Sequence, residues 1–289
     1  MKKNSGAHEP SERGAIVLAG TPIGNLEDAS PRLRRELAEA DVVAAEDTRH
    51  LHHLLSGLGL TLQGRAVAYH EHNEADRATE LVEAAQRGER VVVVSDAGMP
   101  TVSDPGFRVV EAAAASEVPV SVVPGPSAAL TALAGSGLPS DRFTFEGFLP
   151  RKPGERNQRL KQLAGEERTM LFYEAPHRIE ATLEALAAAF GNDRPAVLAR
   201  ELTKLFEQFR RGDLGSLLDG VREDAPRGEI VLVVSGAEPP AAADPAQLVD
   251  RVEALVSTGI RLKDACQQVA TDTGASKREL YQAVLESRS

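Results

Sequence analysis

Short β-branched strands that alternate with helical segments are the feature of this sequence that most constrains its fold. Between the strands, apolar residues recur at three- and four-residue spacing, which is typical of amphipathic helices. Such an alternation forms a mostly parallel sheet covered by helices on both faces. Ser30 is positioned to cap the first helix, and Pro31 to begin it. We therefore predict an α/β domain at residues 14–124, built on a mostly parallel five-stranded sheet with strands at 15–19, 41–45, 65–69, 90–94 and 118–123.

A second set of strands is expected in residues 125–236, after the Pro-rich turn at 124–126. The run "FEQFRR" follows "PAVLAR" closely, so we expect these two to pair as antiparallel neighbours. The second domain is therefore predicted to be α/β with a mixed five-stranded sheet. Its strands are expected at 143–148, 169–173, 195–200, 206–211 and 229–234.

The last part of the chain, residues 245–289, follows a Pro- and Ala-rich linker and contains three short helical patterns. The third opens with Ser276 and Glu279 at capping-box spacing. This arrangement is compatible with a helix-turn-helix whose last helix contacts nucleic acid. From Asp244 onward, however, six Lys or Arg residues face seven Asp or Glu residues. A packing or dimerisation module is therefore an equally good reading of this small C-terminal three-helix unit.

Charge and composition limit the classes of function. No apolar run approaches the ~18 residues that cross a bilayer, and the N-terminus is polar, so we expect a soluble cytoplasmic protein. The single cysteine, Cys266, fits a reducing compartment and is expected to be a small buried residue. The net charge of −10 argues against a surface that coats nucleic acid. A local basic patch exists at residues 151–168, where six basic residues face three acidic ones.

Four loops with unusual turn chemistry follow the first four predicted strands. In a parallel sheet these loops share one edge, where open α/β proteins bind ligands. The fourth, "SDAGMPTVSDPG" at 95–106, combines carboxylates with glycines that allow a close approach of backbone to ligand. Neither the G-x-G-x-x-G fingerprint nor the Walker phosphate loop occurs in the sequence. Loops of this kind suit a positively charged nucleoside such as S-adenosylmethionine.

A resemblance to a known family rests on nine blocks in order: "GTPIGNLEDAS", "AEDTRH", "HEHNE", "SDAGMPTVSDPG", "VVPGPSAALTAL", "GFLPRK", "FYEAPHRI", "RELTKLFE" and "RGEIVLVV". Over residues 14–236 the chain resembles the tetrapyrrole methylase superfamily, and more narrowly its ribosomal RNA branch, the 16S rRNA cytidine-2′-O-methyltransferases. The tail is similar to the helix-turn-helix appendage of that branch. Met99 departs from the pattern, because a smaller residue is expected there.

The resemblance implies a homodimeric methyltransferase outside the common Rossmann class, with S-adenosylmethionine in the cleft between its two domains. Its partner would be 16S rRNA in the small ribosomal subunit, where it would methylate the ribose of a cytidine in the decoding centre, at the P site. Neither DNA nor a membrane is expected as a partner. Carried over block by block, the cofactor-binding residues would be Gly20, Thr21, Pro22, Asp96, Ala97, Gly98, Ser127, Ala128, Ala175, Gly228 and Glu229.

Methyl transfer to a ribose 2′-hydroxyl requires a group that accepts the hydroxyl proton. The candidates at the pocket edge are Glu46, Asp47, His70, His72, and Glu201 with Lys204. Asp47 could instead cap the helix that follows it, and Glu201 with Lys204 could form an ordinary ion pair. Five histidines lie between residues 50 and 72, but their spacing matches no known ligand pattern, so no metal site is expected.

The candidate RNA-binding residues are Arg49, Arg151, Lys152, Arg156 and Arg159. Arg49 could contact either a phosphate or a partner carboxylate. Two other functions remain open: a tetrapyrrole C-methyltransferase, and a non-catalytic RNA-binding or ribosome-assembly protein. The basic segment after "GFLP" and the helical tail argue against the first, since a small acidic macrocycle needs neither.

Overall fold

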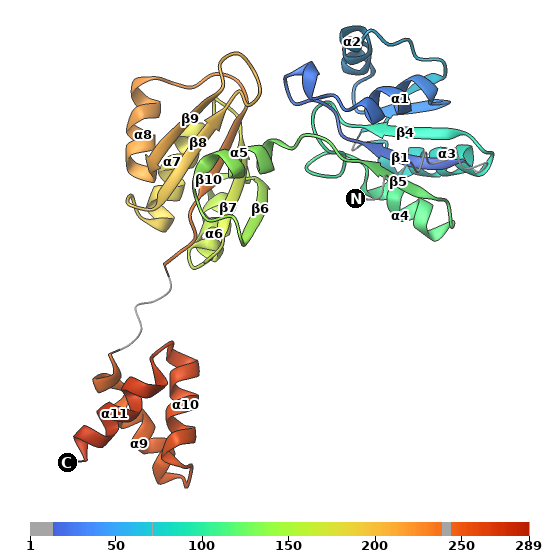
Figure 1. Ribbon diagram of the computed structural model, residues 1–289. Helices are drawn as coiled ribbons and strands as arrows, with labels where there is room; N and C mark the ends of the chain where they lie inside the picture. Colours follow the sequence, from blue (N-terminus) through green and yellow to red (C-terminus); the bar gives the residue numbers. More distant parts are fainter. Residues whose placement is uncertain (1–13, 71, 239–243, 289) are drawn as a thin grey trace, which may run out of the picture. The chain divides into compact units, whose positions relative to one another are not determined.

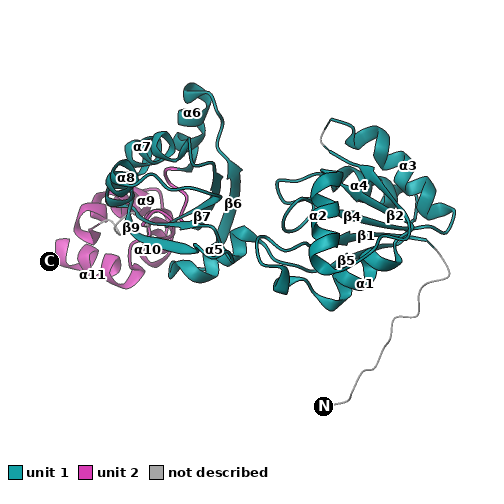
Figure 2. Ribbon diagram, turned by 90° about the horizontal axis from the view of Figure 1, so that it is seen from above, with its two compact units in different colours: residues 1–163, 168–235 teal, residues 164–167, 236–289 magenta. Residues whose placement is uncertain are grey.

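The computed structural model describes residues 14–70, 72–238 and 244–288. The chain divides into two compact units (Figure 2): the larger one ends at Ser235 and excludes residues 164–167, and the smaller one contains 164–167 and the chain from Gly236. No helix in these described ranges is long and apolar enough to cross a membrane.

The first sheet of the larger unit is parallel throughout, with the order β3-β2-β4-β1-β5. This confirms the predicted α/β class. The last strand begins two residues later than expected, because the Val118 N–H bonds to the Ala113 carbonyl at the end of the preceding helix. The strands are β1 (Ala15–Ala19), β2 (Val42–Ala45), β3 (Arg65–Ala68), β4 (Arg90–Val94) and β5 (Val120–Val123).

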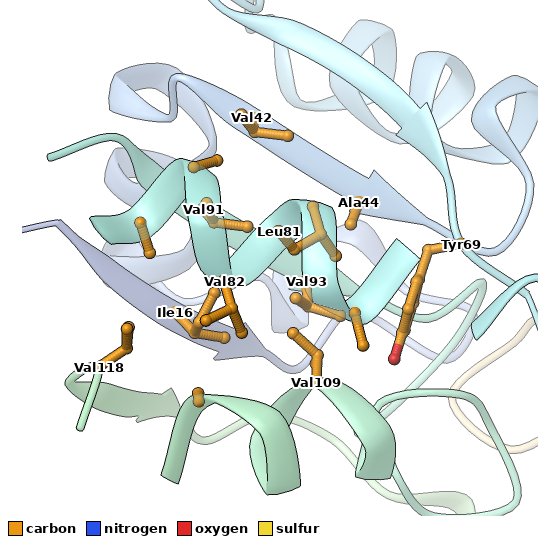
Figure 3. Packing of buried hydrophobic residues seen from close by; sticks show 14 of the residues in the cluster. Ile16, Val42, Ala44, Tyr69, Leu81, Val82, Val91, Val93, Val109 and Val118 are labelled. Carbon is orange, nitrogen blue, oxygen red and sulfur yellow. The ribbon is translucent and has the colours of Figure 1, made fainter. Parts of the chain in front are cut away.

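Helices cover both faces of this sheet, as its continuous apolar strands require. Leu33 of α1 packs with Val17 and Val92 on one face. On the other face, Leu81 of α3 and Val109 of α4 lie over the strands (Figure 3). Ser30 caps α1 by accepting from the Leu33 N–H, and Pro31 begins the helix, both as predicted. The helices are η1 (Leu26–Asp28), α1 (Pro31–Glu39), α2 (Thr48–Leu58), α3 (Glu74–Gln86) and α4 (Phe107–Ala115).

The second sheet is mixed, with the order β6-β7-β10-β8-β9, which confirms the prediction (Figure 1). β6 and β7 are parallel, and the remaining neighbours, including β8 and β9, are antiparallel. β9 begins two residues later than expected, because the Glu207 N–H bonds to the Lys204 carbonyl and closes a turn there. The strands are β6 (Phe143–Phe148), β7 (Thr169–Glu174), β8 (Pro195–Arg200), β9 (Gln208–Asp213) and β10 (Ile230–Val234).

One face of this sheet packs against α5, where Ala129 and Leu133 contact Val197 and Val231. Ile23, from the loop after β1, is buried in the same cluster. The first loop of the chain therefore packs into the core beneath the second sheet. The helices of this half are α5 (Ala128–Ser136), α6 (Pro153–Leu163), α7 (Ile179–Phe190) and α8 (Leu214–Glu223).

The smaller unit has a core of its own, in which Val252, Val269 and Leu280 are fully buried. Cys266 is a free thiol inside this core, as the sequence predicts. Ser276 caps the last helix by accepting from the Glu279 N–H. The domain limits 14–124, 125–236 and 245–289 stay a prediction, since both sheets belong to one compact unit. The elements are η2 (Pro245–Leu248), α9 (Val249–Ser257), α10 (Leu262–Thr273) and α11 (Lys277–Ser287).

Candidate functional site

A cavity of about 220 Å³ opens next to the loops that follow β1 and β4. These two strands are neighbours, but the helices after them lie on opposite faces of the sheet: α1 packs on one face and α4 on the other. The two chains therefore diverge as they leave the sheet, which creates the crevice where α/β proteins bind ligands. Topology alone thus places a binding site where the "SDAGMPTVSDPG" loop lies.

Five of the predicted cofactor-binding residues line the cavity: Ala97, Gly98, Ser127, Ala128 and Glu229. The other lining residues were not among the predicted cofactor-binding residues, although the carboxylate of Asp104 was expected in the pocket wall. Most of these are apolar, and several come from strands of the second sheet. They are Ile23, Met99, Val102, Ser103, Asp104, Phe148, Tyr173, Glu174, Ile230 and Val231.

Gly20, Thr21 and Pro22 do not line the cavity but are buried behind it. The Thr21 N–H donates to the Gly98 carbonyl at 2.9 Å, and the Gly98 N–H returns a bond to Thr21 at 3.2 Å. A Cβ on Gly20 would lie 2.7 Å from the Cα of Gly125, so only glycine permits this approach of two backbones. These residues hold together three loops that surround the cavity.

The loop between β4 and α4 is strained. Thr101 and Ser103 have φ values of 76° and 64°, a region that L-residues with side chains rarely occupy. Glu74 holds the end of this loop in place. One of its carboxylate oxygens accepts from the Gly106 N–H at 2.9 Å and from the Tyr69 hydroxyl at 3.1 Å. Strain that surrounding bonds maintain in this way is typical of functional sites.

Asp96 and Ala175 also lie outside the lining, although both were predicted to bind cofactor. One Asp96 oxygen accepts from the Asp47 N–H, and the other contacts His50 Nδ1 at 2.7 Å. This hydrogen bond raises the pKa of His50. The Ala175 N–H donates to Glu174 at 2.9 Å. The structure therefore gives both residues a supporting position.

Two predicted site residues of the second loop, the catalytic candidate Asp47 and the RNA-binding candidate Arg49, are bonded to each other. Asp47 caps α2 by accepting from the Arg49 N–H at 2.8 Å, and its carboxylate pairs with the Arg49 side chain at 2.6 Å. The hydrogen bond from the Arg49 side chain holds the pKa of Asp47 well below its usual value. The helix-cap reading of Asp47 therefore accounts for its contacts, and Arg49 has its carboxylate partner.

Glu46 and the histidines are placed differently. Burial raises the pKa of Glu46, and the negative charge of Asp96 adds to the effect. Glu46 does not line the cavity. His72 is exposed and its ring meets that of His70 edge-on at 6.0 Å between centroids. Across the described part of the chain, no group of three or more His, Cys, Asp or Glu side chains is arranged to hold a metal ion.

Glu201 and Lys204 form a network with the pocket wall. The Lys204 ammonium contacts Glu201 and Glu229, each at 3.0 Å. Glu201 has a φ of 50°, and its carboxylate would lie 2.1 Å from a Cβ on Gly228. Gly228 thus leaves room for the Glu201 carboxylate, and its contact with the cofactor stays a prediction. The ion-pair reading of Glu201 and Lys204 fits these contacts, and it fixes the position of Glu229.

We expect Lys204→Met to lower the free energy of unfolding of the larger unit by about 1 kcal/mol, because the partly buried Glu201 and the exposed Glu229 lose their shared cation. Urea unfolding followed by circular dichroism measures this. Lys152→Met is the matched control, since Lys152 pairs with Glu155 on an open helix surface, where a pair contributes about 0.3–0.5 kcal/mol. Equal losses of unfolding free energy in the two variants would contradict the inference that Lys204 stabilises the structure by holding Glu201 and Glu229.

The predicted RNA-binding residues of the second half gather at the start of α6, which begins five residues after the pocket residue Phe148. Arg151 is exposed, and no bond or ion pair of its side chain is found in the described ranges. Arg159 pairs with Glu146 at 2.6 Å. Arg156 is partly buried, with no hydrogen-bond partner for its Nε. Apart from Arg156, these cations are exposed, although Lys152 and Arg159 each pair with a glutamate.

Comparison with known protein families gives two matches. Residues 15–218 match the family of tetrapyrrole (corrin/porphyrin) methylases. Residues 242–288 match the RsmI C-terminal HTH domain. The two matches together cover the first sheet, the second sheet except β10, and the small helical unit.

Individual proteins agree with these matches. The chain is 47% identical over 276 residues to the ribosomal RNA small subunit methyltransferase I of Mycobacterium tuberculosis, covering 95% of this chain and 96% of the relative. Among solved structures, the methyltransferase CobJ is similar, with a TM-score of 0.57, 27% identity and coverage of 78% of this chain and 95% of CobJ. A uroporphyrin-III C-methyltransferase from Thermus thermophilus, solved with S-adenosylhomocysteine, shares the fold at a TM-score of 0.54 and 20% identity, covering 77% of this chain and 97% of its own.

Proposed function

The chain belongs to the tetrapyrrole methylase family, and we propose that it transfers a methyl group from S-adenosylmethionine to the 2′-hydroxyl of a cytidine in the decoding centre of 16S rRNA. The coarser activity, S-adenosylmethionine-dependent methylation of ribosomal RNA, rests on one observation. A relative named as a ribosomal RNA small subunit methyltransferase is matched over 95% of the chain, including the helical unit, whereas the match to the methyltransferase CobJ covers 78% of the chain.

The cavity suits this cofactor chemically. Its walls include Ile23, Val102 and Tyr173, which are apolar or aromatic surfaces for an adenosine. Asp104 supplies a negative charge for the sulfonium. The volume of about 220 Å³ is smaller than the ~300 Å³ typical of the smallest ligand pockets, so part of the cofactor would extend beyond the cavity.

The residues of the chain contribute positioning. When bound, the cofactor supplies an electrophilic methyl group on a positively charged sulfur. The paired backbones of Thr21 and Gly98 fix one wall, and Lys204 fixes Glu229 on the other. A rigid pocket that aligns the methyl group with the ribose oxygen removes much of the entropic part of the barrier.

The decisive experiment uses small ribosomal subunits from a strain that lacks this enzyme, incubated with the purified protein and methyl-labelled S-adenosylmethionine. Mass spectrometry of the digested RNA should find one 2′-O-methylcytidine. A methyl group on a base would contradict the ribose assignment. Transfer to a tetrapyrrole but not to RNA would favour a C-methyltransferase, and failure to bind S-adenosylmethionine would favour a non-catalytic RNA-binding protein.

Replacing Arg151, Lys152, Arg156 and Arg159 together by Gln should weaken binding to the small subunit and flatten its salt dependence. Each lost phosphate contact should reduce the slope of log K against log salt concentration by about 0.7–0.9. Filter binding at several salt concentrations measures the slope. Arg222→Gln is the control, because Arg222 pairs with Glu180 and Glu184 on the outer helices. An unchanged slope in the quadruple variant would exclude this surface from the RNA contact.

We also propose that the enzyme is a cytoplasmic homodimer. The location follows from the ribosomal substrate. Dimerisation is implied by the family resemblance, and the larger unit has exposed apolar side chains that an interface could cover, including Leu205 and Phe206, which are 90% and 65% exposed.

A further inference from the structure

Three acidic side chains line the cavity, and two of them are held by cations. Glu174 accepts from the Thr182 hydroxyl at 2.6 Å and pairs with Arg178 at 3.1 Å. Glu229 pairs with Lys204 at 3.0 Å. Neither carboxylate can accept a proton without losing a charge-assisted bond. The third is Asp104, which has no cationic partner in the described part of the chain.

Asp104 is partly buried in the strained loop after β4, beside Ser103. The groups that face it are a hydroxyl and two other carboxylates: Ser95, Glu46 and Asp96. Burial raises the pKa of Asp104 to about 7, and the charge of Glu46 adds to the rise, while the Ser95 hydrogen bond opposes it. Tyr173 lies on the other wall, where burial keeps its phenol protonated.

We propose that Asp104 is the catalytic residue that accepts the proton of the substrate hydroxyl. This inference rests on the proposed function. One bond forms between the ribose oxygen and the methyl carbon as the sulfur–methyl bond breaks. The electron pair of the broken bond stays on sulfur. The 2′-hydroxyl proton moves to the Asp104 carboxylate. A sulfonium, an alcohol and a carboxylate thus become a thioether, a methyl ether and a carboxylic acid, and both mass and charge balance.

The other candidate bases are less suited to this step. Asp47 is bound to Arg49, and Glu201 is bound to Lys204. A carboxylate with a pKa near the working pH is more effective, because it is both sufficiently ionised and sufficiently basic. Glu46 does not line the cavity, but its charge keeps Asp104 basic. Of the carboxylates described at this site, only Asp104 combines access to the cavity with freedom from an ion pair.

Cofactor binding should prepare Asp104 for this role. With a pKa of about 7, Asp104 is protonated in part of the free protein at pH 7. A sulfonium in the same cavity favours the carboxylate and lowers the pKa. Binding of S-adenosylmethionine should therefore release a fraction of a proton at this pH. Calorimetry in buffers of different ionisation enthalpy measures that proton without any turnover.

The test compares the wild type with Asp104→Asn in the full chain. The variant should fold, should release no proton on binding, and should bind S-adenosylmethionine with a Kd raised by no more than about tenfold, since it lacks the charge that favours the sulfonium. Its kcat should fall by about 10²–10⁴, the usual contribution of a general base. The rise of activity with pH should disappear with it. Asp219→Asn, an exposed aspartate on α8, is the control and should match the wild type in all measurements.

Glu46→Gln provides a second variant. Removing its negative charge should lower the pKa of Asp104 and move the rising limb of the pH profile towards acid. The proposal is overturned if Asp104→Asn keeps kcat within tenfold of wild type, or if its Kd rises 100-fold while kcat at saturation is retained, which would make Asp104 a cofactor ligand. If the wild type itself methylates no ribosomal RNA, the proposed function fails instead, and proton release still reports on Asp104.

Discussion

Gly98→Val is expected to raise the Kd for S-adenosylmethionine by about 10- to 100-fold while leaving the fold intact. Gly98 has a φ of 87°, which a β-branched residue adopts only at a cost of about 1–3 kcal/mol. A Cβ there would lie 3.4 Å from Ile23 and 3.5 Å from the Pro126 carbonyl, so the two valine methyl groups have little room. The loop can relieve this strain by leaving the conformation in which it is paired with Thr21. Each 1.4 kcal/mol of free energy by which the unpaired conformation becomes favoured weakens cofactor binding tenfold.

The matched control is Gly88→Val. Gly88 has a φ of 95° in the turn between α3 and β4, and nothing lies within 4 Å of a Cβ built on it. This variant carries the same backbone penalty at a distance from the cavity, so it should lose stability and keep its affinity. Titration calorimetry gives the Kd, and urea unfolding gives the stability. Normal binding by Gly98→Val, or equal weakening in both variants, would remove the loop after β4 from the cofactor site.

The strands were predictable because β-branched runs and their spacing encode them locally. The errors occurred where a hydrogen bond outside the sheet decided the boundary. Val118 continues an apolar run, yet its N–H donates to the Ala113 carbonyl at the end of α4. Phe206 and Glu207 continue an alternating run, yet Glu207 closes a turn in which it also accepts from the Thr203 N–H at 2.7 Å. Such competition between local bonds is invisible to hydrophobic periodicity.

The site was predictable in its loops and less so in its walls. Strand ends in a parallel sheet share an edge by geometry, so Ala97 and Gly98 could be assigned from the sequence. Tyr173 lines the cavity because its strand pairs with β10, where it lies opposite Val231. That register links residues far apart in the chain, and a single sequence does not reveal it. The same limit applies to Asp104. Its importance depends on which carboxylates of the site are paired with a cation, and a single sequence does not reveal those pairs either.

The helical unit leads to the second large expected effect. A chain that ends at Ala237 retains every core cluster of the larger unit, because the two sheets and their helices end at Val234. It should therefore fold and bind S-adenosylmethionine normally. We expect its KM for the small subunit to rise at least ~10-fold, equivalent to about 1.4 kcal/mol of binding. The kcat should stay within about twofold of the intact chain, the pattern of an interaction made equally in ground and transition states.

Electrostatics should contribute little to this loss. Arg251 pairs with Asp272, and Arg288 pairs with Glu253, so part of the positive charge of the unit is already neutralised. The difference in KM between the full-length and the truncated chain should consequently vary little with salt concentration. We therefore expect the unit to recognise the shape of the substrate or to contact protein. Leu280→Asp in the full-length chain is the companion variant, because it places a charge in the core of the helical unit and should reproduce the truncation. An unaltered KM in both proteins would contradict a role for this unit in substrate recognition. Loss of cofactor binding in the truncated chain would contradict the expectation that recognition is its only role.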